Sequence, residues 1–99
     1  MEDQLAVPHF LVHETKDTVG VVVIEGIKAG QTLQGWLMAT DGNLRIKCLN
    51  NIPIGHKVAL KNIKKGDTIM KYGHDIGRAI SDIKKGGHVH VNNVKTKRW

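Results

Sequence analysis

The sequence predicts a mostly β protein built from short strands and tight turns, and three features carry this prediction. Apolar residues make up 40% of the 99 residues, drawn mainly from Val, Ile and Leu, whereas aromatic residues make up only 4%. The 11 glycines cut the β-branched runs into short pieces, which is typical of strands joined by turns. No stretch keeps the spacing of an amphipathic helix over three turns without Gly or Pro.

The clearest strand signals lie in the first half of the chain. Residues 18–24 form a β-branched run, which is expected to be buried on both faces. Residues 34–39 and 44–49 flank Thr40-Asp41-Gly42-Asn43, and Asp-Gly between two strand-like runs predicts a hairpin. Apolar and polar residues alternate along the second arm, so one of its faces should point to the core. A short helical turn is expected at residues 75–80.

An internal repeat organises the rest of the chain. Four segments share the order apolar, two residues, Ile, two residues, Gly, two residues, apolar, and they are 24–33, 49–58, 60–69 and 80–89. We call this pattern the turn module. Its Ile should fill the core, and its Gly can adopt a positive φ where other residues would be strained. The copies are unequally spaced, which favours a compact barrel with repeated corners over a stacked solenoid.

Composition limits the possible partners and compartments. The net charge of +6 can attract nucleic acid, an anionic membrane or a small anionic substrate. The basic residues are mostly scattered lysines with few aromatics, which argues against nucleic acid. The single cysteine excludes an internal disulfide, and neither a signal peptide nor a membrane-spanning segment is recognised, so a cytoplasmic location without membrane attachment is expected. Residues 1–99 are expected to form one domain, too small to wall a deep cleft without a partner.

Histidines are the leading candidates for chemistry. Along residues 88–92, strand alternation would turn Val89 and Val91 toward the core and place His88, His90 and Asn92 on the opposite face. Two imidazoles and an amide in a row can bind a metal or an anionic substrate, or shuttle protons. The alternative is a polar outer face of an edge strand, or a partner interface. No cysteine or carboxylate lies nearby at ligand spacing, so no metal held by this chain alone is expected.

A second candidate group follows the glycine of the second turn module. His56 offers a general acid or base, and Lys57 offers an anchor for a carboxylate. Alternation points them to opposite faces, so only one of the two need serve a site, and an ordinary strand start is the alternative. Tyr72 can donate a hydrogen bond, although a structural role is favoured. Cys48 lies on the core-facing stripe and is expected to be an inert apolar residue.

Several blocks in the second half resemble a known family. They are Asn-Ile-Pro-Ile-Gly-His-Lys-Val-Ala-Leu at 51–60, Ile-x-x-Gly-Asp at 63–67, Lys-Tyr-Gly-x-x-Ile-Gly at 71–77 and Asp-Ile-x-x-Gly-x-His-Val-His at 82–90. In this order they resemble the small domain of the altronate and galactarate dehydratase family. The N-terminal part and the ending 93–99 are more similar to the small subunits of sulfolactate sulfo-lyases, so the resemblance covers nearly the whole chain.

The resemblance implies a fold, a partner and a reaction. The fold would be a SAF-type β-clip, and the partner a larger dehydratase-like subunit that carries most of the active site and a divalent metal, expected to be iron. The reaction would be β-elimination from a small anionic hydroxy acid: sulfolactate to pyruvate plus sulfite, or water from altronate or galactarate. The expected catalytic residues are His56, His88 and His90, and the expected substrate-binding residues are Lys57, Tyr72 and Asn92.

This chain also departs from the family pattern. Relatives commonly read His-Val-His-x-His-Asn, whereas this chain has Asn92 at the third histidine, and Gly87 replaces an acidic residue. An amide keeps hydrogen bonding but not acid or base chemistry, so substrate contact is expected at this position. Residues 1–8 and 93–99 are interpreted as flexible or partner-docking ends. Two alternative functions are a non-catalytic binding module and nucleic-acid binding through the basic tail.

Overall fold

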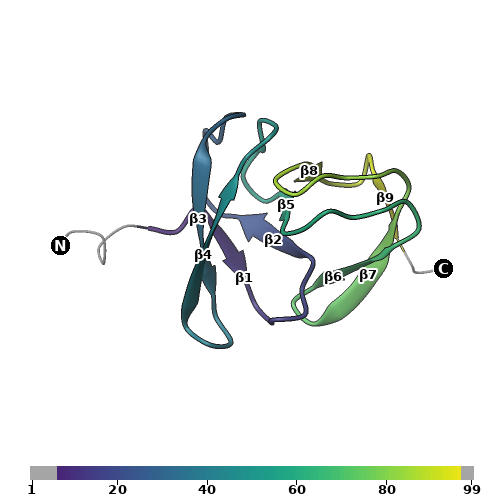
Figure 1. Ribbon diagram of the computed structural model, residues 1–99, viewed down its shortest axis with the longest axis horizontal. Coiled ribbons are helices and arrows are strands. Elements are labelled where there is room, and N and C mark those ends of the chain that lie inside the picture. The colour runs from purple at the N-terminus through teal and green to yellow at the C-terminus, as the bar shows by residue number, and fades with distance from the viewer. Residues whose placement is uncertain (1–6, 97–99) are drawn as a thin grey trace.

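A computed structural model describes residues 7–96, and within them the chain forms β-strands and no helix. One sheet has six strands in the order β4-β3-β1-β2-β5-β8, and the other has three in the order β6-β7-β9. In Figure 1 the β3–β4 hairpin stands at one end of the molecule and the second sheet at the other. The strands are β1 (Phe10–Val12), β2 (Val19–Val22), β3 (Thr32–Leu37), β4 (Gly42–Lys47), β5 (Lys57–Ala59), β6 (Thr68–Lys71), β7 (His74–Ala79), β8 (His88–Val89) and β9 (Val94–Thr96).

The mostly β prediction is therefore confirmed, and the core has two parts. One apolar cluster consists of Phe10, Val12, Val22, Ile27, Leu33, Ile46, Cys48, Ile52 and Val58. The other consists of Val19, Ala59, Ile63, Ile69, Ala79, Ile83, Val89 and Val94. Strands β2 and β5 supply side chains to both clusters, which is possible because neighbouring residues of a strand point to opposite faces. These two strands thus join the two halves of the molecule.

The turn module is confirmed in all four copies. Its isoleucines are buried and pair as antiparallel bridges, Ile27 with Ile52 and Ile63 with Ile83. The module glycines all have a positive φ: Gly30 92°, Gly55 88°, Gly66 92° and Gly86 89°. In each copy the residue after the glycine donates its backbone N–H to the carbonyl three residues earlier, which closes a tight turn. One pair of modules serves each part of the core.

Polar side chains hold the modules together in pairs. In the second pair, Asn62 Oδ1 accepts a hydrogen bond from the Lys85 N–H at 2.9 Å, and Asp82 Oδ1 accepts one from the Lys65 N–H at 2.8 Å. In the first pair, Asn51 Oδ1 accepts from the Ala29 N–H at 2.9 Å. Gly26 occupies the matching place in the other copy and has no side chain that could accept a second hydrogen bond. The second pair is therefore the more symmetric one.

The predicted hairpin is also confirmed, but its turn lies at residues 38–41, so Gly42 and Asn43 belong to β4 rather than to the turn. Strands β3 and β4 pair antiparallel from Thr32 opposite Lys47 to Leu37 opposite Gly42. The left-handed position in the turn is taken by Asp41, with a φ of 56°. Asp41 Oδ1 accepts a hydrogen bond from Trp36 Nε1 at 2.9 Å, so the carboxylate is tied across the turn. Cys48, just beyond β4, is fully buried as expected, and burial raises the pKa of its thiol.

The helical turn predicted at residues 75–80 is wrong. Strand β7 covers His74–Ala79 and pairs with β6 on one side and β9 on the other. A single helical turn is costly to nucleate, whereas strands on both sides give this segment a ladder of backbone hydrogen bonds. Of the ending 93–99, residues 94–96 form β9 and Val94 is buried, while residues 97–99 and 1–6 lie outside the described residues.

Candidate functional site

Three of the six histidines meet beside strands β5 and β8. These strands pair antiparallel, with Val58 opposite His88, and His56 immediately precedes β5. The ring of His56 stacks on that of His90, with centroids 3.5 Å apart and planes within 10°. His56 Nδ1 also lies 2.8 Å from His88 Nε2, so one of these nitrogens donates a hydrogen bond and the other accepts it. We call these three residues the histidine cluster.

The predicted alternation of residues 88–92 holds only for its first half. Strand β8 ends at Val89, and the chain then turns, because Asn93 Oδ1 accepts from the His90 N–H at 2.9 Å and Asn93 Nδ2 donates to the His88 carbonyl at 2.8 Å. The prediction that Val91 faces the core is therefore wrong, since Val91 is 71% exposed. Asn92 lies in the exposed turn and leaves the row, whereas His88 and His90 stay together with ring centroids 6.0 Å apart.

The surroundings of His88 and His90 favour the neutral form of these two imidazoles. Burial lowers the pKa of His88, with further lowering by the positive charges of His56, His90 and Lys57. Burial also lowers the pKa of His90, followed by the charges of His56 and Lys57. Within the described residues, Nδ1 of His90 is buried and has no hydrogen-bond partner. A neutral imidazole with an unpartnered ring nitrogen is suited to accept a proton or a ligand hydrogen bond.

A small cavity of about 140 Å³ adjoins the cluster. We call it the cationic pocket, and its described lining residues are Lys57, Lys71, Ile76, His90, Val91, Val94 and Thr96. Burial lowers the pKa of Lys57, and the neighbouring charge of Lys71 lowers it further. His90 connects the pocket to the cluster, since its ring stacks on His56 and also lines the pocket with Lys57. His56 and Lys57 therefore serve one region although they follow each other in the chain.

Tyr72 lies in the turn between β6 and β7, next to the pocket but not in its lining. Tyr72 and Gly73 have φ values of 55° and 77°, the pair of left-handed residues that a type I′ hairpin turn requires. The Nζ atom of Lys71 lies 5.4 Å from the centroid of the Tyr72 ring, within the range of a cation–π contact. The ring of His13 meets Tyr72 edge to face at 5.1 Å. Tyr72 is thus linked to the described pocket lining through Lys71.

A buried carboxylate fixes this turn. Asp17 is 6% exposed, and its oxygens accept hydrogen bonds from the Tyr72 N–H at 3.0 Å and the Gly73 N–H at 2.7 Å. The same carboxylate accepts from the N–H groups of His13 and Glu14, both at 3.1 Å. Sequence reasoning missed both Asp17 and Lys71. The Lys-Tyr-Gly block is a signal for Lys71, whereas nothing around Asp17 in the sequence marks it as buried.

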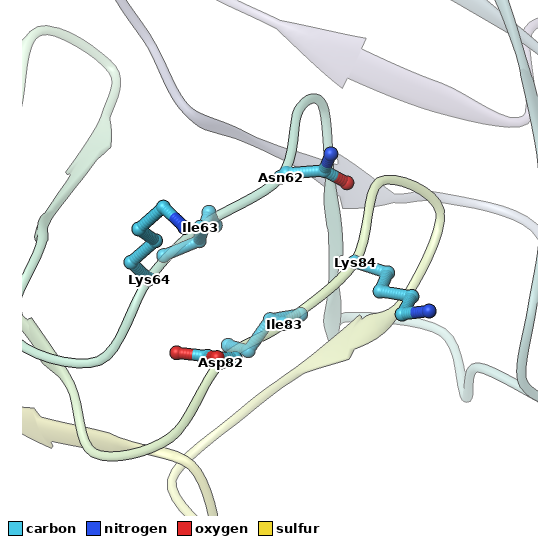
Figure 2. A pocket seen from close by; sticks show the side chains of 6 residues that line it. All are labelled: Asn62, Ile63, Lys64, Asp82, Ile83 and Lys84. Atoms are coloured by element: carbon cyan, nitrogen blue, oxygen red, sulfur yellow. The ribbon is translucent and has the colours of Figure 1, made fainter.

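A larger cavity of about 260 Å³ lies elsewhere, between the paired turn modules at Ile63 and Ile83. Figure 2 shows its two walls, with Asn62, Ile63 and Lys64 on one loop and Asp82, Ile83 and Lys84 on the other. We call it the module groove. Both of its lysines are exposed, and its described lining contains no histidine. Its size therefore does not make it the better candidate for chemistry.

The cluster does not fit a metal centre. Among residues 7–96, no group of three His, Cys, Asp or Glu side chains is arranged to hold a metal ion. The geometry gives the reason, because His56 Nδ1 is directed at His88 Nε2 rather than at a shared open position.

In the same described range, no helix is long and apolar enough to cross a membrane.

The two-sheet fold with its repeated glycine corners is that of a SAF domain, and the chain belongs to a family of such domains. The family model described as "Altronate/galactarate dehydratase SAF domain" matches residues 8–97. The resemblance inferred from the sequence blocks is thereby confirmed.

Individual relatives narrow this assignment. The chain is 52% identical to (2R)-sulfolactate sulfo-lyase subunit alpha of Chromohalobacter salexigens, over 91% of this chain and 96% of that protein. It is 54% identical to the protein of the same name from Paracoccus pantotrophus, over 60% of this chain and 88% of that one. It is 37% identical to altronate dehydratase of Bacillus subtilis, over 88% of this chain but only 16% of that enzyme. These relatives are thus named as a lyase subunit or contain the matched segment as a small part of a longer enzyme.

Proposed function

We propose that this chain is the small subunit of a two-subunit lyase that converts sulfolactate to pyruvate and sulfite in the cytoplasm. A larger dehydratase-like subunit would carry the rest of the active site. The observation that carries the proposal is the position of His90, whose ring stacks on His56 and lines the cationic pocket with Lys57. A proton acceptor and an anion-binding group thus meet on one face. The 52% identity to a sulfo-lyase subunit supports the choice of reaction.

The elimination needs a base beside the substrate carboxylate. A base removes the proton from the carbon that bears the hydroxyl, the C–S bond breaks, and its electron pair leaves with sulfite. The resulting enol of pyruvate then takes a proton at its methylene carbon, loses its hydroxyl proton and becomes the ketone. His90 is the proposed base because its buried Nδ1 has no hydrogen-bond partner in the described residues and its pKa is lowered by burial. His56 and His88 are proposed to exchange protons with the substrate as a separate hydrogen-bonded pair, since only ring stacking links His56 to His90.

Lys57 is the proposed anchor for the substrate carboxylate, where positive charge also stabilises the developing enolate. Two further predicted contacts remain proposals. Asn92 is exposed in the turn after His90, where a closing partner would bring its amide to the substrate. Tyr72 lies outside the described lining of the pocket and is proposed to act through Lys71.

The divalent metal implied by the family, with iron expected, is proposed to be held mainly by the larger subunit. The residues of the histidine cluster do not offer a shared ligand position, so no step of the proposed mechanism is assigned to a metal on this chain. When bound in the partner, such a metal would polarise the substrate oxygens. Removal of sulfite by this chain alone is accordingly not expected.

Co-expression with the larger chain tests the proposal. The purified pair should release sulfite from (2R)-sulfolactate, and the larger chain without this one should not. His90→Gln should lower kcat by about 100-fold or more, as expected for loss of a general base. His74→Gln is the matched control, because His74 is exposed on β7 and outside the cluster. Failure to form a complex, with activity unaffected by this chain, would contradict the proposal.

A sugar-acid dehydratase is the second candidate, favoured by the 37% identity to altronate dehydratase. The same complex should therefore be assayed with altronate and galactarate, where water rather than sulfite would leave. Dehydration without sulfite release would select this candidate. If the free chain binds a small acid unaided but no complex forms, the chain is instead a non-catalytic binding module.

A further inference from the structure

The structure assigns a second cationic residue to the site. We propose that Lys71 and Lys57 form a two-lysine subsite that selects a small acid with two negative groups, such as one sulfonate and one carboxylate. This inference rests on the proposed function. It adds the number of negative groups on the substrate and the residue that recognises the second of them.

The position of the two lysines supports a shared ligand. Lys57 begins β5 in the larger sheet and Lys71 ends β6 in the smaller sheet, yet both line the same cavity of about 140 Å³. Since a water molecule occupies about 30 Å³ in the liquid, the cavity has room for a charged head group on a short carbon stem. Ile76 and Val94 supply apolar walls, which weaken solvent screening on their side of the cavity and strengthen the attraction of the ammonium groups for an anion.

The two charges have no counterion among the described residues. The described lining of the pocket contains no Asp or Glu, and the ion pairs among residues 7–96 include neither lysine. Two ammonium groups in one half-buried cavity repel each other, and the charge of Lys71 contributes to lowering the pKa of Lys57. A bound anion would relieve this repulsion. Two half-buried charges without a partner among the described residues are thus the feature that points to a ligand.

Lys71 is also held in place for this task. Its Nζ lies over the ring of Tyr72, and the backbone of Tyr72 is fixed in the left-handed region by the carboxylate of Asp17. A non-glycine residue with a positive φ costs free energy, so such strain is kept where a position matters. Asp17 is 6% exposed and accepts four backbone hydrogen bonds, which makes it a positioning residue for Lys71. A positioned ammonium loses less entropy on binding an anion.

Anion binding can be tested on the full chain without its partner. Sodium sulfate is the probe, because it is a small dianion, and amide NMR shifts report where it binds. Sulfate should shift the amides around Lys57, Lys71 and His90, and Lys57→Met or Lys71→Met should weaken its binding at least tenfold. Methionine keeps a long apolar stem without the charge. Lys64→Met and Lys84→Met in the module groove are the matched controls and should change sulfate affinity less than twofold.

Kinetics of the complex provide the second measurement. Lys71→Met should raise the KM for sulfolactate at least tenfold with a smaller change in kcat, and Lys71→Arg should restore most of the loss. Lactate is a monoanion without the sulfonate, so its inhibition constant for the wild-type complex should be far higher than the KM for sulfolactate. In Lys71→Met the ratio of these two constants should be smaller.

The outcomes separate this inference from the proposed function. If sulfate binding depends on both lysines but the complex releases no sulfite, the subsite stands and the proposed reaction fails. If the complex releases sulfite while Lys71→Met leaves both KM and sulfate affinity within twofold, the reaction stands and the two-lysine subsite is overturned. A Lys71→Met chain that does not fold is replaced by Lys71→Gln, with unfolding temperature as the folding control.

Discussion

Two cavities of this small protein are bordered by lysines, and they differ in almost every other respect. The module groove is larger, about 260 Å³ against about 140 Å³ for the cationic pocket. In the groove, Lys64 and Lys84 are exposed, and the carboxylate of Asp82 shares the lining. In the pocket, Lys57 and Lys71 are half-buried, and no described lining residue is acidic. Among the described lining residues, a histidine, His90, borders only the second of these lysine pairs.

The difference shows what distinguishes a structural corner from a candidate site. In the groove, Asp82 accepts from the Lys65 N–H and Asn62 from the Lys85 N–H, so polar side chains satisfy the backbone of two paired turns. The lysines of neither cavity have a partner among residues 7–96 within ion-pair distance, but those of the pocket are half-buried and have no acidic residue in the described lining. In the module groove, polar side chains thus stabilise the turns by satisfying backbone groups. In the cationic pocket, the lysines carry charges that a bound anion would neutralise. Cavity size alone would select the wrong one.

Of the changes that test this comparison, the largest effect is expected when a carboxylate like that of Asp82 in the groove is introduced into the pocket. Thr96 lines the pocket from β9, so Thr96→Asp would place an anion beside Lys57 and Lys71. It should lower kcat/KM for sulfolactate on the order of 100-fold, because a fixed anion competes with the substrate and repels it. Thr96→Asn is the isosteric control and should change kcat/KM less than fivefold. Equal losses in both variants would indicate a steric effect rather than charge.

A smaller effect is expected from the residue that positions Lys71. Asp17→Asn replaces one acceptor oxygen of a carboxylate that holds four N–H groups, and it should lower the free energy of unfolding by about 2–3 kcal/mol. Chemical denaturation measures this change. The folded variant should also show a higher KM for sulfolactate with a nearly unchanged kcat. A stability loss with an unchanged KM would restrict Asp17 to a structural role.

Much of the fold could be predicted from the sequence because its rules are local. The module glycines need a positive φ and the module isoleucines need burial, and both follow from the residue pattern. Which copies pair could not be predicted, because the bridges between Ile27 and Ile52 and between Ile63 and Ile83 depend on long-range packing. The error at residues 75–80 has the same origin, since β7 owes its conformation to its neighbours β6 and β9.

The candidate site could be predicted only in part from the sequence, for a related reason. The histidines are conspicuous by type, but alternation failed at Val91 because the side chain of Asn93 bonds back to the His88 carbonyl and turns the chain. The Lys-Tyr-Gly block marks Lys71 in the sequence but says nothing of its neighbours. Its role follows from strands of separate sheets that bring it to the same cavity as Lys57, a relation that no local pattern encodes.

The smallest effect concerns pH. Burial lowers the pKa values of His88 and His90 from their ordinary value of 6.5, so the unfolded chain binds more protons than the folded chain as the pH falls below that value. Their contribution to stability is complete above pH 6.5 and is lost on acidification toward their folded pKa values. The free energy of unfolding should therefore decrease from pH 7 to pH 5, and less steeply in His88→Gln/His90→Gln. Parallel urea titrations check the difference, and equal slopes would contradict it.

The most direct measurement of which region meets the larger subunit is hydrogen exchange with and without that subunit. Binding should protect the amides of residues 88–94 and of Lys57, which surround the histidine cluster and the cationic pocket. The amides of residues 64–67 and 84–86, in the turns of the module groove, should exchange at unchanged rates. Protection of the module groove, with unchanged exchange at residues 88–94, would contradict the assignment of the histidine and lysine face to a shared active site.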